Sequence, residues 1–299
     1  MKKEPTELPT FQPPTAAPPT KAAPAPLERQ PIPGVRNILA VASGKGGVGK
    51  STVAVNLALA LGRRGKTVGI CDADVYGPSI PLMLGLNERP TLGPDQKIVP
   101  LSRYGLKVMS IGFLVEENTA VIWRGPMVMK MLQEFLRNVN WGELDYLVLD
   151  LPPGTGDAQL TIVQTVPLSG AIIVTTPNDM ALIDARRGLA MFREVSVPVL
   201  GIIENMSSFE CPHCHTLTPV FDAGGGKRTA DELGVPFLGE IPLDLEIRRG
   251  GDTGRPTVAV NPESVQAGAF LRLADAVLER TGPGTGERKG ALRSFLSRL

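Results

Sequence analysis

The stretch that decides the fold is "SGKGGVGKST", residues 43–52. Within it, residues 44–51 match the pattern G-x-x-x-x-G-K-[ST] and lie between an apolar run and an amphipathic segment. Glycines let backbone N–H groups approach phosphate oxygens, and the N-terminus of the following helix adds partial positive charge. The sequence therefore predicts a nucleotide phosphate-binding loop (P-loop) between a strand and a helix.

Each residue of this loop has an expected role. Lys50 reaches the β- and γ-phosphates of ATP, and the Ser51 hydroxyl ligates Mg²⁺. A second lysine, Lys45, is not required by the pattern, so its role needs a separate explanation. The remaining predicted nucleotide contacts are Gly44, Gly46, Gly47, Val48, Gly49 and Thr52.

Strand-like and helix-like segments alternate along the chain downstream of this loop. Continuous apolar runs that end in polar residues are typical of parallel strands covered on both faces by helices. The pattern predicts an α/β fold with a doubly wound, mostly parallel sheet. The expected strands cover residues 37–43, 66–74, 105–113, 144–152, 170–177, 197–205 and 237–242, and the expected helices cover 50–65, 125–139, 157–166, 181–195 and 262–280.

Composition divides the chain into three parts. Residues 1–33 hold ten of the 28 prolines and few large apolar residues, so we expect a disordered arm. Residues 34–281 form the predicted nucleotide-binding domain. Residues 282–299 begin Gly-rich and end in a short amphipathic stretch, which we expect to be a flexible tail whose contact with membranes is weak or absent.

The whole-chain balance excludes some classes of protein. The net charge of +1 argues against a stable complex with nucleic acid. No apolar run approaches the roughly 20 residues of a membrane-spanning helix, and no apolar stretch follows the two N-terminal lysines as a secretory signal requires. With only three cysteines, the chain is expected in the reducing cytoplasm.

Carboxylates follow two of the predicted strands. Asp72 and Asp74 end one strand, and Asp150 ends another. Strand-end aspartates also serve as turn or cap residues. Ligands of open α/β sheets bind outside the carboxyl ends of the strands, so carboxylates beside a P-loop favour a functional role. Asp150 is expected to hold Mg²⁺ through water, and an aspartate near the γ-phosphate orients the attacking water.

The pair "CPHC" at 211–214 has the spacing of metal ligands within the loop 206–220. Alternatives are two unpaired thiols or a redox pair. His213 and His215 are expected as exposed loop residues, because four ligands within five residues would struggle to surround one metal. A symmetric second chain would supply two more thiolates and complete a Cys₄ site for a [4Fe–4S] cluster or Zn²⁺. Cys71 lies in a predicted buried strand and is expected in the core.

The stretch "KGGVGKST" resembles the deviant P-loop of a family that includes MinD/ParA-like cell-division and plasmid-partition ATPases, nitrogenase iron protein and Mrp/ApbC-type iron–sulfur cluster carriers. Further stretches are similar to the Mrp/ApbC branch and extend over about 210 residues. They are "CDADVYGPSIPLMLG", "WRGPM", "LDYLVLDLPPGTGDAQLT", "TTPNDMALIDARRG" and "GIIENMSSFECPHC". Many members carry an additional small N-terminal domain, whereas this chain has the Pro-rich arm there.

The resemblance implies a homodimer with nucleotide sandwiched between the subunits. Lys45 would act on the partner's nucleotide, and Asp74 would orient the attacking water. Asp150 and Asp157 would belong to the second switch, and Asn205 would contact the adenine.

The resemblance also implies ATP hydrolysis, with a [4Fe–4S] cluster favoured as the cargo bridged by Cys211 and Cys214 of both chains and passed to apo iron–sulfur proteins. Three other functions use the same residues differently. They are a positioning ATPase on membrane or nucleoid, a redox protein similar to nitrogenase iron protein, and a zinc-bridged structural dimer.

Overall fold

The computed structural model describes residues 29–114, 125–214, 216–221 and 224–282. The main sheet in these residues is built from β1 (Val35–Ala42), β2 (Val68–Asp72), β5 (Leu101–Arg103), β6 (Leu106–Ser110), β7 (Leu144–Asp150), β8 (Gly170–Thr175), β9 (Val199–Asn205) and β12 (Phe237–Ile241). Their order is β12-β9-β8-β1-β7-β2-β6-β5. Every pairing is parallel except that of β5 with β6. The prediction of a mostly parallel sheet is confirmed.

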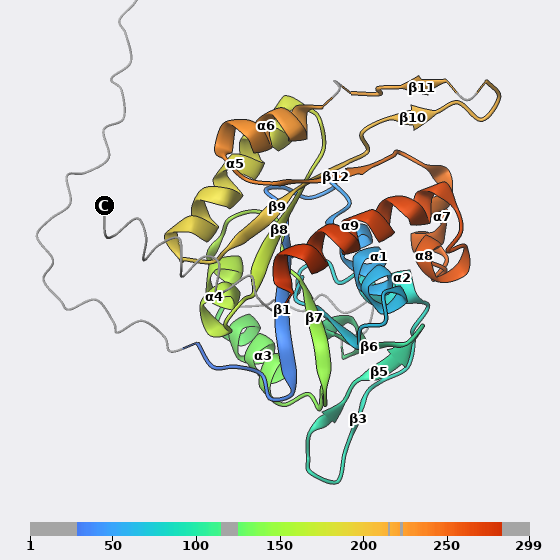
Figure 1. The fold of residues 1–299 in the computed structure, drawn as a ribbon. Coiled ribbons are helices and arrows are strands. Elements are labelled where there is room, and N and C mark those ends of the chain that lie inside the picture. The colour runs from blue at the N-terminus through green and yellow to red at the C-terminus, as the bar shows by residue number, and fades with distance from the viewer. Residues whose placement is uncertain (1–28, 115–124, 215, 222–223, 283–299) are drawn as a thin grey trace, which may run out of the picture.

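Helices cover both faces of this sheet (Figure 1). One side carries α1 (Lys50–Arg63), α2 (Ile80–Leu84), α7 (Leu245–Asp252), α8 (Thr257–Val260) and α9 (Val265–Thr281). The other side carries α3 (Gly125–Arg137), α4 (Asp157–Thr165), α5 (Asp179–Glu194) and α6 (Gly225–Leu233). A short 3₁₀ helix, η1 (Ile111–Phe113), follows β6. Because both faces of the sheet are covered, the buried parts of its central strands are almost entirely apolar.

The burial of the strands explains their sequence pattern. All residues of β2 and β8 are buried, as are the last five of β1 and of β7. Cys71 is fully buried in β2, as expected. The apolar runs end where the strands reach the carboxyl edge of the sheet, and there the polar residues Asp72, Ser110, Asp150 and Asn205 begin.

Two small hairpins were not expected from the sequence. They are β3 (Thr91–Leu92) with β4 (Ile98–Val99), and β10 (Phe209–Glu210) with β11 (Leu217–Thr218). Strands of two residues are too short to show an alternation of apolar and polar side chains. The β10–β11 hairpin leaves the carboxyl end of β9 and extends beyond the body of the sheet (Figure 1).

Two predicted segments fall largely outside this description. Of the predicted disordered arm, residues 1–28 lie outside the described residues, as do residues 283–299 of the predicted tail. Among the described helices, none is long and apolar enough to cross a membrane.

Candidate functional site

The P-loop connects β1 to α1 and has the backbone form that its glycines predict. Gly47 and Gly49 both have φ of +81°, in the left-handed region that favours glycine. A Cβ added at Gly46 or Gly47 would meet nothing within 4 Å, so these residues border open space. A Cβ at Gly49 would lie 2.2 Å from Nδ2 of Asn205. The loop therefore leaves room for a ligand above its middle and packs tightly at its end.

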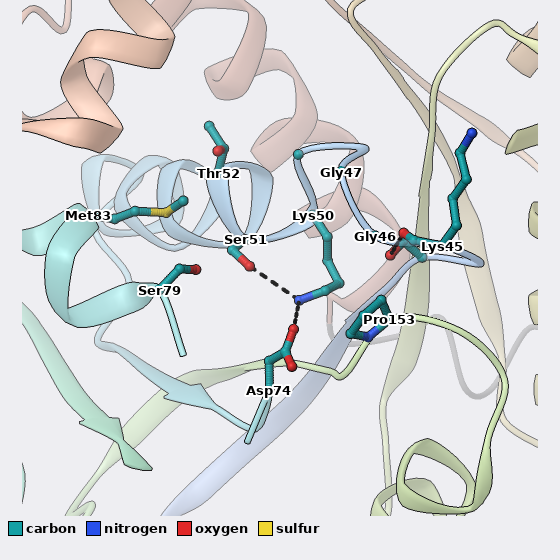
Figure 2. A pocket seen from close by; sticks show the side chains of 12 residues that line it. Lys45, Gly46, Gly47, Lys50, Ser51, Thr52, Asp74, Ser79, Met83 and Pro153 are labelled. Carbon is teal, nitrogen blue, oxygen red and sulfur yellow. Dashed lines mark hydrogen bonds and ion pairs between the residues drawn. The ribbon is translucent and has the colours of Figure 1, made fainter. Parts of the chain in front are cut away.

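A cleft lies over this loop (Figure 2). Among the predicted nucleotide contacts, Gly44, Val48, Asp150 and Asn205 lie outside its lining. Gly44 packs instead against Asp184, where a Cβ would lie 2.3 Å from the backbone. The cleft is lined by Ser43, Lys45, Gly46, Gly47, Gly49, Lys50, Ser51, Thr52, Asp74, Ser79, Met83 and Pro153.

Lys50 contacts the neighbouring Ser51 and two carboxylates that are distant in sequence. Its Nζ lies 2.7 Å from Oδ1 of Asp150, 3.2 Å from the Ser51 hydroxyl and 3.5 Å from Oδ2 of Asp74. Lys50 is only 6% exposed and Asp150 is fully buried. The ammonium group therefore lies within ion-pair distance of two carboxylates at the floor of the cleft, in a position to meet phosphate.

The oxygen atoms around Lys50 fit a hard divalent cation. Oδ2 of Asp150 is buried and has no hydrogen-bond partner among the described residues. The Ser51 hydroxyl and the Asp74 carboxylate lie on the same side of the cleft (Figure 2). Carboxylate and hydroxyl oxygens, completed by water and phosphate, are the ligands that Mg²⁺ takes in nucleotide sites.

Burial shifts the pKa values of two carboxylates at this end of the sheet, Asp74 and Asp72. It raises the pKa of Asp74 above its ordinary value, and the charge of Lys50 partly offsets that shift. Burial, followed by repulsion from Asp150, raises the pKa of Asp72 to about 8. Carboxylates with raised pKa values that gather beside a cleft are typical of functional sites.

Lys45 extends away from this cluster (Figure 2). Its Nζ donates a hydrogen bond of 3.3 Å to Oδ1 of Asn178, which also caps α5 by accepting from the Ala181 N–H. Within one chain the Lys45 ammonium therefore contacts the start of α5. It has no bond to Lys50 or Asp74 among the described contacts.

Asn205 ends β9 and binds the P-loop backbone. Its Nδ2 donates a 2.8 Å hydrogen bond to the Val48 carbonyl, and its side chain is buried. The preceding Glu204 is buried as well and accepts from the Gly226 N–H at the start of α6. The end of β9 thus fastens both the P-loop and α6. The predicted contact of Asn205 with adenine stays a prediction.

Cys211 and Cys214 lie at the tip of the β10–β11 hairpin. The Cys211 N–H donates to the Thr216 carbonyl at 3.1 Å, which closes the turn. The Cys214 sulfur is exposed and lies 3.3 Å from the Thr216 hydroxyl, whose hydrogen bond lowers the pKa of this thiol. His213 is exposed as expected, and His215 lies outside the described residues.

The described residues of the hairpin do not complete a metal site in one chain. No group of three or more His, Cys, Asp or Glu residues able to hold a metal occurs in the part of the chain that the structure describes. Cys211 and Cys214 are both free thiols. Asp157 begins α4, and its side chain lies outside the described part.

Comparison with known proteins places this geometry in a family. A profile described as ParA, NUBPL iron-transfer P-loop NTPase, matches residues 34–278. The chain belongs to the NUBPL iron-transfer P-loop NTPase family.

Curated members of the NUBPL family are similar over most of the chain. The mouse iron-sulfur cluster transfer protein NUBPL is 53% identical over 255 residues, which is 85% of this chain and 80% of the mouse protein. The Escherichia coli iron-sulfur cluster carrier protein is 52% identical over 253 residues, 84% of this chain and 69% of the relative.

Solved structures extend the likeness to the fold. A nucleotide-binding protein of Archaeoglobus fulgidus, in complex with ADP, is 40% identical to this chain, with a TM-score of 0.69. The match covers 79% of this chain and 93% of the Archaeoglobus chain. The cell division ATPase MinD of Pyrococcus furiosus is 25% identical with a TM-score of 0.61, over 81% and 98% of the two chains. Both findings agree with the NUBPL family and with the predicted MinD-like architecture.

Some site residues of this family member were missed by sequence reasoning. Ser79, the N-cap of α2, and Met83, near the end of α2, both line the cleft. Both lie in the stretch of residues 71–85 that resembles Mrp/ApbC proteins, but nothing in the sequence assigned them a role. Asn178 holds Lys45 and was detectable only as a helix cap, because an Asn before an amphipathic segment is a capping signal.

Proposed function

We propose that this chain is an ATP-hydrolysing carrier that binds an iron–sulfur cluster between two copies of itself and transfers it to apo-proteins. The observation that carries the proposal is the pair of free thiols, Cys211 and Cys214, at the tip of an exposed hairpin on a P-loop NTPase. Two thiolates half-coordinate a cluster that needs four ligands, and a symmetric second copy supplies the rest. The names of the mouse and E. coli relatives support the carrier role.

The proposed hydrolytic roles follow from the contacts of Lys50. Lys50 exchanges its carboxylate contacts for the β- and γ-phosphates, and Asp74 orients the attacking water. Ser51 and Asp150 would hold Mg²⁺, which would supply positive charge against the negative charge of the phosphates. Exclusion of water by the buried floor of the cleft strengthens each of these interactions.

Lys45 is proposed to act on the nucleotide of the partner subunit. Its ammonium group extends away from its own cleft to the start of α5, where Met180 and Ile183 expose large apolar side chains. Methionine is enriched at protein interfaces, so exposed Met180 favours an interface beside Lys45. A lysine delivered across that interface would stabilise charge on the transferring phosphoryl group, as an arginine finger does.

Asn205 is proposed to contact the adenine ring. Its position favours this role because its side chain touches the P-loop backbone at Val48 and packs against Gly49. The side-chain amide has both a donor and an acceptor, as recognition of a base edge requires.

No observation favours the alternative functions. The likeness to MinD concerns the fold, and the amphipathic stretch that a membrane-positioning ATPase would use lies outside the described residues. A zinc-bridged dimer would use the same two cysteines, and only a metal-binding experiment distinguishes it from a cluster carrier. Relatives of similar identity include bacterial proteins and one named as mitochondrial, so the cytoplasmic location stays a prediction.

Anaerobic reconstitution with iron and sulfide tests the proposal. We expect a coloured dimer with about one cluster per two chains, given four ligands per cluster. The cluster should move to an apo-ferredoxin, followed by the absorbance of the separated proteins. Cys211→Ala and Cys214→Ala should lose the colour, and Cys71→Ala should keep it because Cys71 is buried in β2.

Two results would overturn the proposal. Iron that stays bound to a monomer, or to the Cys211 and Cys214 variants as well as to the parent, contradicts a bridging cluster. Binding of zinc alone, with iron and sulfide present, would replace the carrier with a structural dimer.

A further inference from the structure

Asp72 is a buried carboxylate to which neither the nucleotide site nor the cysteine hairpin assigns a role. It is the last residue of β2 and is completely inaccessible to solvent. In the sheet register it stands between Ser110 of β6 and Asp150 of β7. It is not among the residues that line the nucleotide cleft.

Its two oxygen atoms join three segments of the chain. Oδ1 accepts from the N–H of Asp74 at 3.2 Å. Oδ2 accepts from the N–H of Ile80 at 3.2 Å and from the Ser110 hydroxyl at 2.9 Å. Through these hydrogen bonds Asp72 holds both ends of the loop 74–79 at the edge of the sheet.

This loop carries the proposed water-orienting residue. The Asp74 side chain faces the cleft, 3.5 Å from Nζ of Lys50, while its backbone N–H is bound by Asp72 from below. Ser79, which also lines the cleft, directly precedes Ile80. Movement of either anchored end would displace Asp74 relative to Lys50.

The chemistry of Asp72 argues that it is more than an ordinary turn residue. Burying a carboxylate next to a second buried carboxylate, Asp150, is unfavourable unless hydrogen bonds compensate it. A neutral side chain would avoid that penalty, but an amide has one acceptor oxygen and cannot serve backbone donors on both sides. The two oxygen atoms of Asp72 satisfy both backbone donors and the serine at once.

We propose that Asp72 is a positioning residue that holds Asp74 in place for ATP hydrolysis. This inference rests on the proposed ATPase function. It assigns Asp72 no contact with nucleotide, so its loss should slow turnover and leave nucleotide affinity in place.

Asp72→Asn tests the inference. The amide loses an acceptor for either the Asp74 or the Ile80 N–H, so we expect kcat to fall at least about tenfold, as small misplacements of reacting groups do. The Kd for a fluorescent ADP analogue should stay within about threefold, since uniform binding is untouched. Ser110→Ala removes only the hydroxyl contact and should give a smaller loss of kcat with the same Kd.

Asp145→Asn is the matched control. Asp145 lies at the opposite end of β7 and accepts from the Thr67 N–H and hydroxyl at 2.9 and 3.0 Å. The same substitution there weakens the hydrogen bonds to Thr67 and the ion pair with Arg36 without touching the loop 74–79. It should lower the melting temperature and leave kcat at the parent value.

The results of these measurements distinguish failure of the Asp72 inference from failure of the proposed ATPase function. A parent protein that hydrolyses ATP while Asp72→Asn does so within twofold of its rate overturns the inference alone. So does a fall in kcat matched by an equal fall in nucleotide affinity, or by an equal fall in Asp145→Asn. If Asp72→Asn does not fold, a parent-like kcat in Ser110→Ala overturns it. A folded parent without ATPase activity overturns both.

Discussion

At the scale of single residues, the proposed functional groups include a charged side chain that the fold buries and a thiol that it exposes. Lys50 is buried between two carboxylates, although lysine is usually exposed. Cys214 is exposed on a hairpin tip, although free cysteine is usually buried. Each departure places a reactive group where a ligand can reach it, and each leads to a prediction.

Lys50→Ala should abolish hydrolysis and weaken ATP binding by about 10- to 100-fold. A charge-assisted hydrogen bond contributes about 1.5–3 kcal/mol, and Lys50 is placed to make such bonds to phosphate. Its removal also leaves buried Asp150 without its counter-charge, so the apo variant should melt at a lower temperature. Isothermal titration and thermal denaturation measure both effects. Unchanged affinity for ATP would contradict the phosphate role.

Cys214 should be the first of the three cysteines to react with iodoacetamide. The Thr216 hydroxyl lowers the pKa of this exposed thiol, so its thiolate, the reactive form, is already populated at a pH where an ordinary thiol is protonated. Cys71 should not react in the native protein, because it is fully buried and burial raises its pKa.

The test is the pH dependence of alkylation, followed by mass spectrometry of peptides. Thr216→Val removes the hydroxyl and should shift the Cys214 profile to higher pH. Equal profiles for the parent and Thr216→Val would show that the hydroxyl does not stabilise the thiolate.

At the scale of elements, the end of β9 links the two proposed sites. Asn205 holds the P-loop at Val48, and six residues later Cys211 begins the turn of the hairpin. Between them Met206 has φ of +58°, which is uncommon for a residue with a side chain. The P-loop therefore packs directly on the end of β9. Gly49, at this contact, is the position that is sensitive to substitution.

Gly49→Ala should destabilise the protein by about 1–3 kcal/mol, in the range of local backbone strain. The new Cβ would lie 2.2 Å from Nδ2 of Asn205, and Gly49 has φ of +81°. Gly46→Ala is the matched control, because its Cβ would meet nothing within 4 Å. Urea unfolding of both variants measures the difference. Equal stability of the two would contradict the tight packing of β9 on the P-loop.

At the scale of the whole molecule, the described part of one chain leaves both proposed sites incomplete. The described part of the cysteine hairpin offers two ligands. Lys45 lines its own cleft, but its ammonium group bonds to Asn178 at the start of α5. A symmetric dimer that brought a second copy to the same face would meet both needs.

Mixing Lys45→Ala with Asp74→Ala should recover hydrolysis. In the heterodimer, one site combines the intact Asp74 of one chain with the intact Lys45 of the other. Random pairing at equal amounts makes half of the dimers mixed, each with one working site, so about a quarter of the parent rate is expected. Phosphate release over a series of mixing ratios measures it. A rate that never exceeds that of the single variants would place Lys45 in its own cleft.

The amino-acid sequence by itself determined the seven parallel strands of the sheet, the helices α1, α3, α4, α5 and α9, and the P-loop. It did not indicate the edge strand β5 or the helices α2, α6, α7 and α8. The apolar runs are long and the helical pattern of residues 50–65 is strong, and such local signals depend on no distant contact. The P-loop is predictable for the same reason, since eight consecutive residues contain its glycines, its lysine and its hydroxyl. The similarity of longer stretches to Mrp/ApbC proteins agrees with the family to which the chain belongs.

Only the tertiary structure decided which side chains meet. The contact of Lys50 with Asp150 joins residues 100 positions apart, and that of Asn205 with Val48 joins residues 157 apart. The role of Asp72 as an anchor depends on the register of β2 between β6 and β7. Strand order and register are set by packing of the whole sheet, so no local pattern of residues encodes these contacts.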